Sequence, residues 1–173
     1  PIVHVMSEIA GISAILIAAD LLATARGGAG VLLGGIAGVP PAKVVILGAG
    51  VVAEFATRTA LGLGAEVRIF DNNVYKLTRL QNQVGRQLHT SVINPIHLKK
   101  QLLSADVAIG GGDVGADRKI AGGAGGVLGH QGVFREVGAI VQRSWGGEEW
   151  IAGQVTGRQR GVLDLDAVHA GEA

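Results

Sequence analysis

The chain has 173 residues, of which 48% are hydrophobic and only 17% charged. This length suits one domain with a substantial core, and the low charge predicts a domain covered on several sides by helices, a second domain or other subunits. A net charge of +1 and 3% aromatic residues disfavour a nucleic-acid-binding surface. Because the sequence contains no cysteine, it excludes disulfides, zinc–thiolate sites and a cysteine nucleophile. The five histidines lack metal-ligand spacing, so no metal site is expected.

The first long apolar segment is Ser7–Ala25, which has the length of a helix, and Ser7 is placed to cap its N-terminus. Apolar residues cover nearly all of its faces, which predicts a helix buried on several sides, between domains or under a sheet. The uncharged run from Ile9 to Ala19 is well short of the ~20 residues that span a bilayer, and it lacks the basic start of a secretory signal. A cytoplasmic protein that does not associate with membranes is therefore expected, and Pro1 is interpreted as the cut end of a longer chain.

The next segment, Arg26–Pro41, is rich in glycine and closes with two prolines. Glycine and proline at this density predict turns and a connector, with one short strand at Val31–Leu33. Residues 1–42 are therefore expected to form a buried helix and a Gly-rich connector that lead into the main domain.

Short, branched segments alternate with helical ones in the next part of the chain. The expected strands are Val44–Leu47, Val67–Phe70, Leu88–Val92 and Val107–Ile109, and the expected helices between them are Val51–Leu63, Val74–Val84 and Pro95–Leu103. Strands that alternate with helices of this length predict a parallel sheet with right-handed crossovers. Residues 43–110 are thus expected to form a Rossmann-type, doubly wound α/β unit, whose sheet is incomplete on its C-terminal side.

A strand, a glycine loop and a helix follow one another at the start of this unit. The loop runs from Gly48 through Gly50 to Ala53 and has the pattern G-x-G-x-x-A. In dinucleotide-binding loops the first glycine permits a tight turn, the second leaves room for the pyrophosphate, and the small third residue lets the helix pack close to the strand. Asp71 closes the next strand, where a carboxylate binds the adenosine ribose hydroxyls and repels a 2′-phosphate. The pattern predicts NAD binding; the alternatives are a βαβ turn without a ligand, a flavin site or another adenine-nucleotide site.

Three separated motifs, in this order, resemble the NAD-binding domain of alanine dehydrogenases. They are MSEIAG at residues 6–11, RGGAGVLLGG at 26–35 and GVPPAKVVILGAG at 38–50. The alpha subunit of proton-translocating transhydrogenase is a relative that shares the first and third patterns, whereas the second fits alanine dehydrogenase better. The resemblance covers roughly residues 1–110.

The resemblance implies an NAD-binding domain of an enzyme that interconverts L-alanine and pyruvate plus ammonia, with NAD as hydride acceptor. It places Val51 and Val52 as backbone over the pyrophosphate, and Lys76 on the adenosine side. The expected cofactor-binding residues are Ser7, Gly48, Gly50, Val51, Val52, Asp71 and Lys76. Two of them have simpler alternatives, since Ser7 can be only a helix cap and Lys76 only a solvated helix charge.

This chain departs from the family in two ways that limit which functional residues can be assigned to it. The family's substrate-binding Arg and Lys and its catalytic His lie in a separate domain that begins before the start of this chain. The family's Asp-Gln-Gly-Gly segment, whose Asp takes part in catalysis, has no counterpart here, and Asp113 and Asp117 lie in unrelated contexts. No catalytic residue is therefore assigned.

The isolated chain is expected to be inactive as an alanine dehydrogenase. In the parent protein L-alanine and pyruvate would bind through the missing substrate domain, and the low charge and apolar first helix favour a homo-oligomer. The alternatives are a transhydrogenase alpha-subunit domain and a non-catalytic NAD-binding module.

The family pattern stops just after Gly110. Residues 111–173 hold more than half of the 29 glycines, and no clear period of 2 or 3.6 residues follows Ile120. This composition is typical of an out-of-frame reading of GC-rich DNA, so we interpret the tail as a frameshift product; a divergent end of the domain and a fused module are the alternatives. A tail of this kind is expected to be irregular and to leave an edge of the sheet unpaired.

The frameshift hypothesis makes a direct prediction about the gene. Reading the coding DNA around Gly110 in the other frames should restore an Asp-Gln-Gly-Gly segment downstream. If no frame contains that segment, the tail is genuine divergence and the parent protein lacks the family's catalytic Asp.

Overall fold

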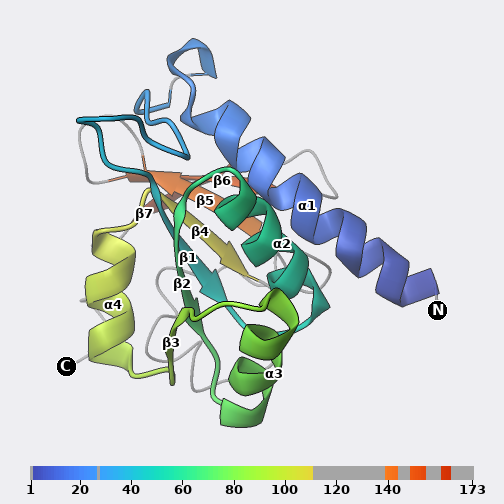
Figure 1. The fold of residues 1–173 in the computed structure, drawn as a ribbon. Helices are drawn as coiled ribbons and strands as arrows, with labels where there is room; N and C mark the ends of the chain where they lie inside the picture. Colours follow the sequence, from blue (N-terminus) through green and yellow to red (C-terminus); the bar gives the residue numbers. More distant parts are fainter. Residues whose placement is uncertain (1, 27, 111–138, 144–148, 155–160, 165–173) are drawn as a thin grey trace.

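A central sheet with helices on both faces organises the chain (Figure 1). The computed structural model describes residues 2–26, 28–110, 139–143, 149–154 and 161–164, the last three ranges as backbone alone. In chain order the elements are α1 (Ile2–Leu22), the 3₁₀ turn η1 (Thr24–Arg26), β1 (Lys43–Leu47), α2 (Val51–Gly62), β2 (Glu66–Phe70), α3 (Val74–Val84), β3 (His89–Ser91), α4 (Pro95–Leu103), β4 (Val107–Gly110), β5 (Ala139–Arg143), β6 (Glu149–Gln154) and β7 (Gly161–Asp164).

The first four strands are parallel and lie in the order β3-β2-β1-β4. Lys43 is paired with Glu66 across β1 and β2, and Val44 with Val107 across β1 and β4. The chain moves outward from β1 to β3 and then returns to β4 on the other side of β1. The strand order therefore reverses between β1 and β4, which is the point where Rossmann-type folds bind ligands at the carboxyl ends of their strands. The predicted parallel α/β sheet is confirmed.

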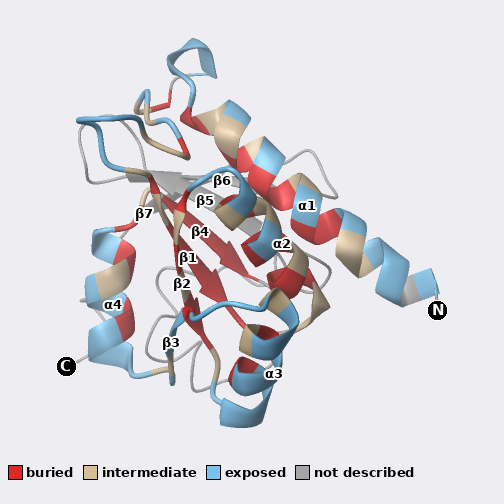
Figure 2. Ribbon diagram, viewed as in Figure 1, coloured by how far each residue is buried: buried red, intermediate tan, exposed pale blue. Residues whose placement is uncertain are grey.

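Alternate residues of the parallel strands supply two separate cores. Figure 2 shows the central strands buried along most of their length. On one face Val44 and Ile46 of β1 pack with α1, α2 and α3. On the other face Val45 and Leu47 pack against Leu98 and its neighbours on α4. Because both faces of the sheet are covered, the central strands β1 and β4 are buried and apolar at nearly every position, as is usual for parallel sheets.

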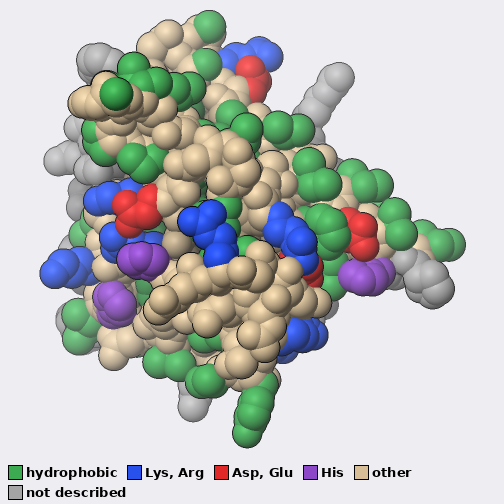
Figure 3. Space-filling view, in the orientation of Figure 1, with side chains coloured by type: hydrophobic (Ala, Val, Ile, Leu, Met, Phe, Trp, Pro, Cys, Tyr) green, Lys and Arg blue, Asp and Glu red, His purple; other side chains and the backbone are tan. Residues whose placement is uncertain are grey.

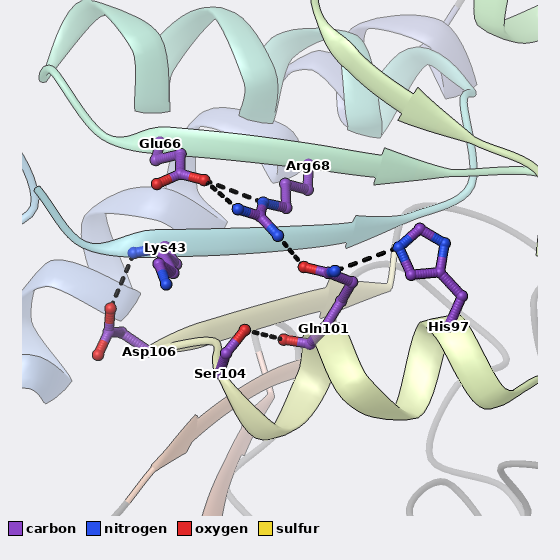
Figure 4. A network of polar contacts seen from close by, with 7 residues as sticks. All are labelled: Lys43, Glu66, Arg68, His97, Gln101, Ser104 and Asp106. Atoms are coloured by element: carbon purple, nitrogen blue, oxygen red, sulfur yellow. Dashed lines mark hydrogen bonds and ion pairs between the residues drawn. The ribbon is translucent and has the colours of Figure 1, made fainter.

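Polar contacts add to the packing on the α4 side of the sheet (Figure 4). Arg68 on β2 binds Glu66 on its own strand, with Nη2 and Oε1 2.6 Å apart, and also binds Gln101 on α4. The amide nitrogen of Gln101 lies 3.2 Å from His97 Nε2, and the His97 ring stands edge-on to Phe70 with centroids 5.7 Å apart. These contacts attach the short α4 to β2 and account for a charged residue inside a strand.

Helix α1 begins five residues earlier than the sequence analysis predicts. Ser7 consequently lies inside the helix and is not its N-cap, so that prediction is wrong. α1 runs beside α2 in the same direction (Figure 1), and the two helices come very close at Gly11. A Cβ added to Gly11 would lie 2.4 Å from the carbonyl oxygen of Val52 and 2.9 Å from the amide nitrogen of Ala56. Only a residue without a side chain fits this contact.

The opposite face of α1 is exposed within the described part of this chain, and its burial by another domain or subunit stays a prediction. Large apolar side chains with exposed fractions from 39% to 77% follow this face, and Figure 3 shows hydrophobic atoms along the helix. They are Ile2, Val5, Met6, Ile9, Ile12 and Leu16. By length and composition alone, His4–Leu22 could cross a membrane, although one third of that window is buried here. A core helix of a soluble protein meets the same two criteria, and α1 has a close partner in α2.

The connector between α1 and β1 contains no strand at Val31–Leu33, contrary to the sequence prediction. Positive φ angles at Gly30 and Gly35 bend the backbone on either side of this run, which leaves it too short to pair along the sheet. One hydrogen bond, from the Ala42 amide to the Leu33 carbonyl at 3.0 Å, holds the connector beside the start of β1.

Strands β5, β6 and β7 extend the sheet beyond β4 in antiparallel order. Val107 of β4 is paired with Gln142 of β5, so this edge of the parallel sheet is covered. The prediction of an irregular tail and an unpaired edge is therefore wrong for these segments. Antiparallel strands need no crossover helix between them. The alternation of strand-like and helical segments that predicted the parallel unit is therefore not expected for β5–β7. Trp145 and the side chain of Trp150 lie outside the described residues, and the frameshift remains a prediction.

The contact between α1 and α2 predicts that Gly11→Ala destabilises the protein. The new methyl group would collide with α2 backbone, which cannot rotate away, and overpacking of this kind costs about 1–3 kcal/mol. The matched control is Gly62→Ala in α2, because a Cβ there meets nothing within 4 Å. Thermal unfolding followed by circular dichroism should show a lower Tm for Gly11→Ala and an equal or higher Tm for Gly62→Ala. A Gly11→Ala variant as stable as the control would contradict the packing.

Candidate cofactor-binding site

The glycine loop lies at the carboxyl end of β1, between this strand and α2. Gly48 has a φ of +96°, a conformation that favours glycine, and its amide donates a hydrogen bond to the Phe70 carbonyl at 2.7 Å. The loop thus turns sharply while its first residue stays attached to the end of β2. Ala53 is fully buried between α2 and the sheet, as expected for a small third residue.

The start of α2 differs from the starts of the next two helices. Asn73 accepts a hydrogen bond from the Lys76 amide at the start of α3, and Asn94 caps α4 in the same way. α2 instead starts at Gly50, which offers no side-chain acceptor. Since the first amides of a helix have no partner within the helix, those of α2 can bind an anion.

Asp71 follows β2 and holds the glycine loop. Its Oδ2 accepts a hydrogen bond from the Ala49 amide and its Oδ1 one from the Asn73 amide, each at 2.7 Å. The carboxylate thereby joins the loop after β1 to the loop after β2. An ionised carboxylate has about four acceptor positions, so two remain for further donors such as ribose hydroxyls. Asp71 is half-buried, which leaves it within reach of a ligand.

Arg79 on α3 is a contact of the glycine loop that the sequence analysis missed. Its Nη2 donates a hydrogen bond to the Ala49 carbonyl at 3.3 Å, whereas the amide of the same residue donates to Asp71. No sequence motif indicates this contact, because it depends on how α3 packs beside the loop. Asn73, by contrast, could have been predicted, since asparagine directly before a helix is a frequent N-cap.

The remaining predicted residues lie near the same end of the fold. Val51 and Val52 form the first turn of α2, and Val52 is buried. Lys76 is exposed in the first turn of α3, beyond Asp71. Ser7 lies one helical turn before Gly11 on α1, toward the end of α2 where the loop lies (Figure 1). The cofactor contacts of Ser7 and Lys76 remain predictions. Within the described ranges no group of three or more His, Asp or Glu residues is placed to hold a metal ion.

Several known proteins are similar to this chain. "Alanine dehydrogenase 2" of Staphylococcus aureus (strain USA300) is 40% identical over 110 residues, which cover 64% of this chain and 30% of that protein. The protein of the same name from strain NCTC 8325 / PS 47 has the same identity and coverage. The chain thus spans about a third of the length of these relatives.

Among solved structures, an L-alanine dehydrogenase is 43% identical with a TM-score of 0.59, and the match covers 61% of this chain and 29% of that one. A transhydrogenase from Sinorhizobium meliloti is 26% identical with a TM-score of 0.43, which is too low to relate the two folds. The family model described as "Alanine dehydrogenase/PNT, C-terminal domain" matches residues 14–119, more than half of the chain. The chain therefore belongs to the alanine dehydrogenase/PNT C-terminal domain family.

Proposed function

We propose that this chain is the NAD-binding domain of an alanine dehydrogenase. The observation that carries the proposal is the Gly48–Ala53 loop, which leads into an uncapped helix and is held by Asp71. The same proposal is supported by family membership and by the reversal of strand order beside β1.

The residues of the site fit the two ends of an adenine dinucleotide. The pyrophosphate would lie on the amides of Gly50, Val51 and Val52, where the positive end of the α2 dipole favours an anion. The two free acceptor positions of Asp71 would bind the adenosine ribose hydroxyls. Bound NAD supplies a hydride acceptor; this chain would bind it and hold it in place.

In the parent protein we propose the reaction of L-alanine, NAD and water to give pyruvate, ammonia and NADH. The substrate would bind to a domain that this chain does not contain, because the chain spans only about 30% of its relatives. The curated relatives named above are alanine dehydrogenases, so the transhydrogenase alternative has weaker support. We further propose a cytoplasmic homo-oligomer that binds neither nucleic acid nor membrane, in which other parts of the assembly cover the exposed face of α1.

The site predicts that the chain binds NADH more tightly than NADPH. The negative charge of Asp71 would repel a 2′-phosphate, and a close like-charge contact of this kind costs at least about tenfold in affinity. Fluorescence titration of the 173-residue chain with each cofactor measures the two Kd values. Equal affinities, or tighter NADPH binding, would show that Asp71 does not face the ribose.

Gly50→Val should abolish NADH binding without unfolding the protein. Gly50 has φ −86° and ψ −168°, an extended conformation that valine also adopts, so the backbone is not strained. The branched side chain would instead occupy the place of the pyrophosphate. The matched control is Gly62→Val, at the opposite end of α2. Normal NADH binding by a folded Gly50→Val variant would show that the cofactor lies elsewhere.

A further inference from the structure

The peptide groups on either side of Ala49 are bound by two side chains of opposite charge. Asp71 accepts the amide at 2.7 Å, and the Arg79 guanidinium donates to the carbonyl at 3.3 Å. The amide nitrogen and carbonyl oxygen of one residue are about 3 Å apart, so the two charged groups lie within roughly 9 Å of each other. This separation is about one Debye length at physiological salt, and a ligand charge between the two groups would feel both of them.

We propose that Arg79 determines cofactor selectivity together with Asp71: it anchors the glycine loop, and it is the cation that binds a ribose 2′-phosphate once the charge of Asp71 is removed. The inference rests on the proposed function, since it concerns the same site. Guanidinium groups bind phosphate through paired hydrogen bonds, and an arginine near the end of β2 can accommodate a 2′-phosphate in Rossmann-type folds. In the native chain Asp71 lies next to the ribose and its repulsion dominates.

A purely structural role for Arg79 would have different consequences. If Arg79 only supported the loop, its loss would weaken NADH and NADPH binding by the same factor, whatever stands at position 71. If Arg79 also binds the 2′-phosphate, its loss should weaken NADPH binding more than NADH binding, and mainly when Asp71 is neutral. The effect of one substitution in the background of the other therefore separates the two roles.

The experiment measures Kd for NADH and NADPH by fluorescence titration of the full chain, with four variants: Asp71→Ser, Arg79→Met, the double variant and Asp71→Ser with Arg86→Met. Arg86 is an exposed arginine just beyond the far end of α3, about 16 Å along the helix from its start, so the last variant removes an equal charge away from the loop. Asp71→Asn, which keeps the size of the side chain, replaces Asp71→Ser if the serine variant does not fold.

We expect Asp71→Ser to lower the preference for NADH over NADPH by about tenfold or more. Adding Arg79→Met should then weaken NADPH binding about tenfold more than NADH binding, as for loss of a charge-assisted hydrogen bond. Adding Arg86→Met to Asp71→Ser should leave the ratio of the Kd values for NADPH and NADH unchanged.

Equal losses for both cofactors in the double variant would overturn the inference while leaving the proposed function intact. Adding Lys76→Met to Asp71→Ser provides a second check: if that change removes NADPH binding and Arg79→Met does not, Lys76 is the phosphate ligand and the inference is wrong. A native chain that binds neither cofactor would overturn the proposed function, and this inference with it.

Discussion

The hydrogen bond between the Asp71 carboxylate and the Ala49 amide connects the two loops from which the site is built. One loop follows β1 and the other follows β2, and their relative position decides whether the helix amides and the carboxylate can bind one ligand together. A charged acceptor strengthens this bond, because ion–dipole hydrogen bonds are roughly twice as strong as neutral ones. Asp71, which would bind the ribose, thus also holds the glycine loop on which the pyrophosphate would lie.

This arrangement depends on small residues around the start of α2. Gly11 of α1 lies against the α2 backbone at Val52 and Ala56, and Ala53 of α2 is buried in the core that includes the sheet. Because neither has a large side chain, α2 packs closely on both neighbours and its N-terminus is fixed over the end of β1. The exposed apolar face of α1 lies away from this contact, so the site can keep its shape whether or not another domain or subunit covers that face.

The parallel part of the fold could be predicted from the sequence, because each of its elements has a strong local signal. Val74–Val84 and Pro95–Leu103 have the predicted bounds, each preceded by an asparagine cap. The errors lie where local signals are weak or where tertiary contacts decide. α1 starts before its apparent cap at Ser7. Strands β5–β7 pair in antiparallel order, which no alternation with helical segments in the sequence predicts.

In the site, the residues whose role follows from backbone geometry or charge, such as Gly48, Gly50 and Asp71, could be predicted from the sequence. Arg79 could not, since its contact with Ala49 exists only once α3 has packed beside the loop. Residues defined by a motif can thus be read from the chain, whereas residues that support the motif from another helix require the structure.

Amide chemical-shift mapping of the ¹⁵N-labelled chain with NADH tests the central claim most directly. At 17.6 kDa the chain is suited to this measurement. We predict that NADH shifts the amides of Gly50, Val51 and Val52 most strongly, together with that of Asp71, and leaves those of α4 unchanged. Strong shifts confined to α4 or to the connector before β1, with the Gly48–Ala53 loop unaffected, would contradict the account.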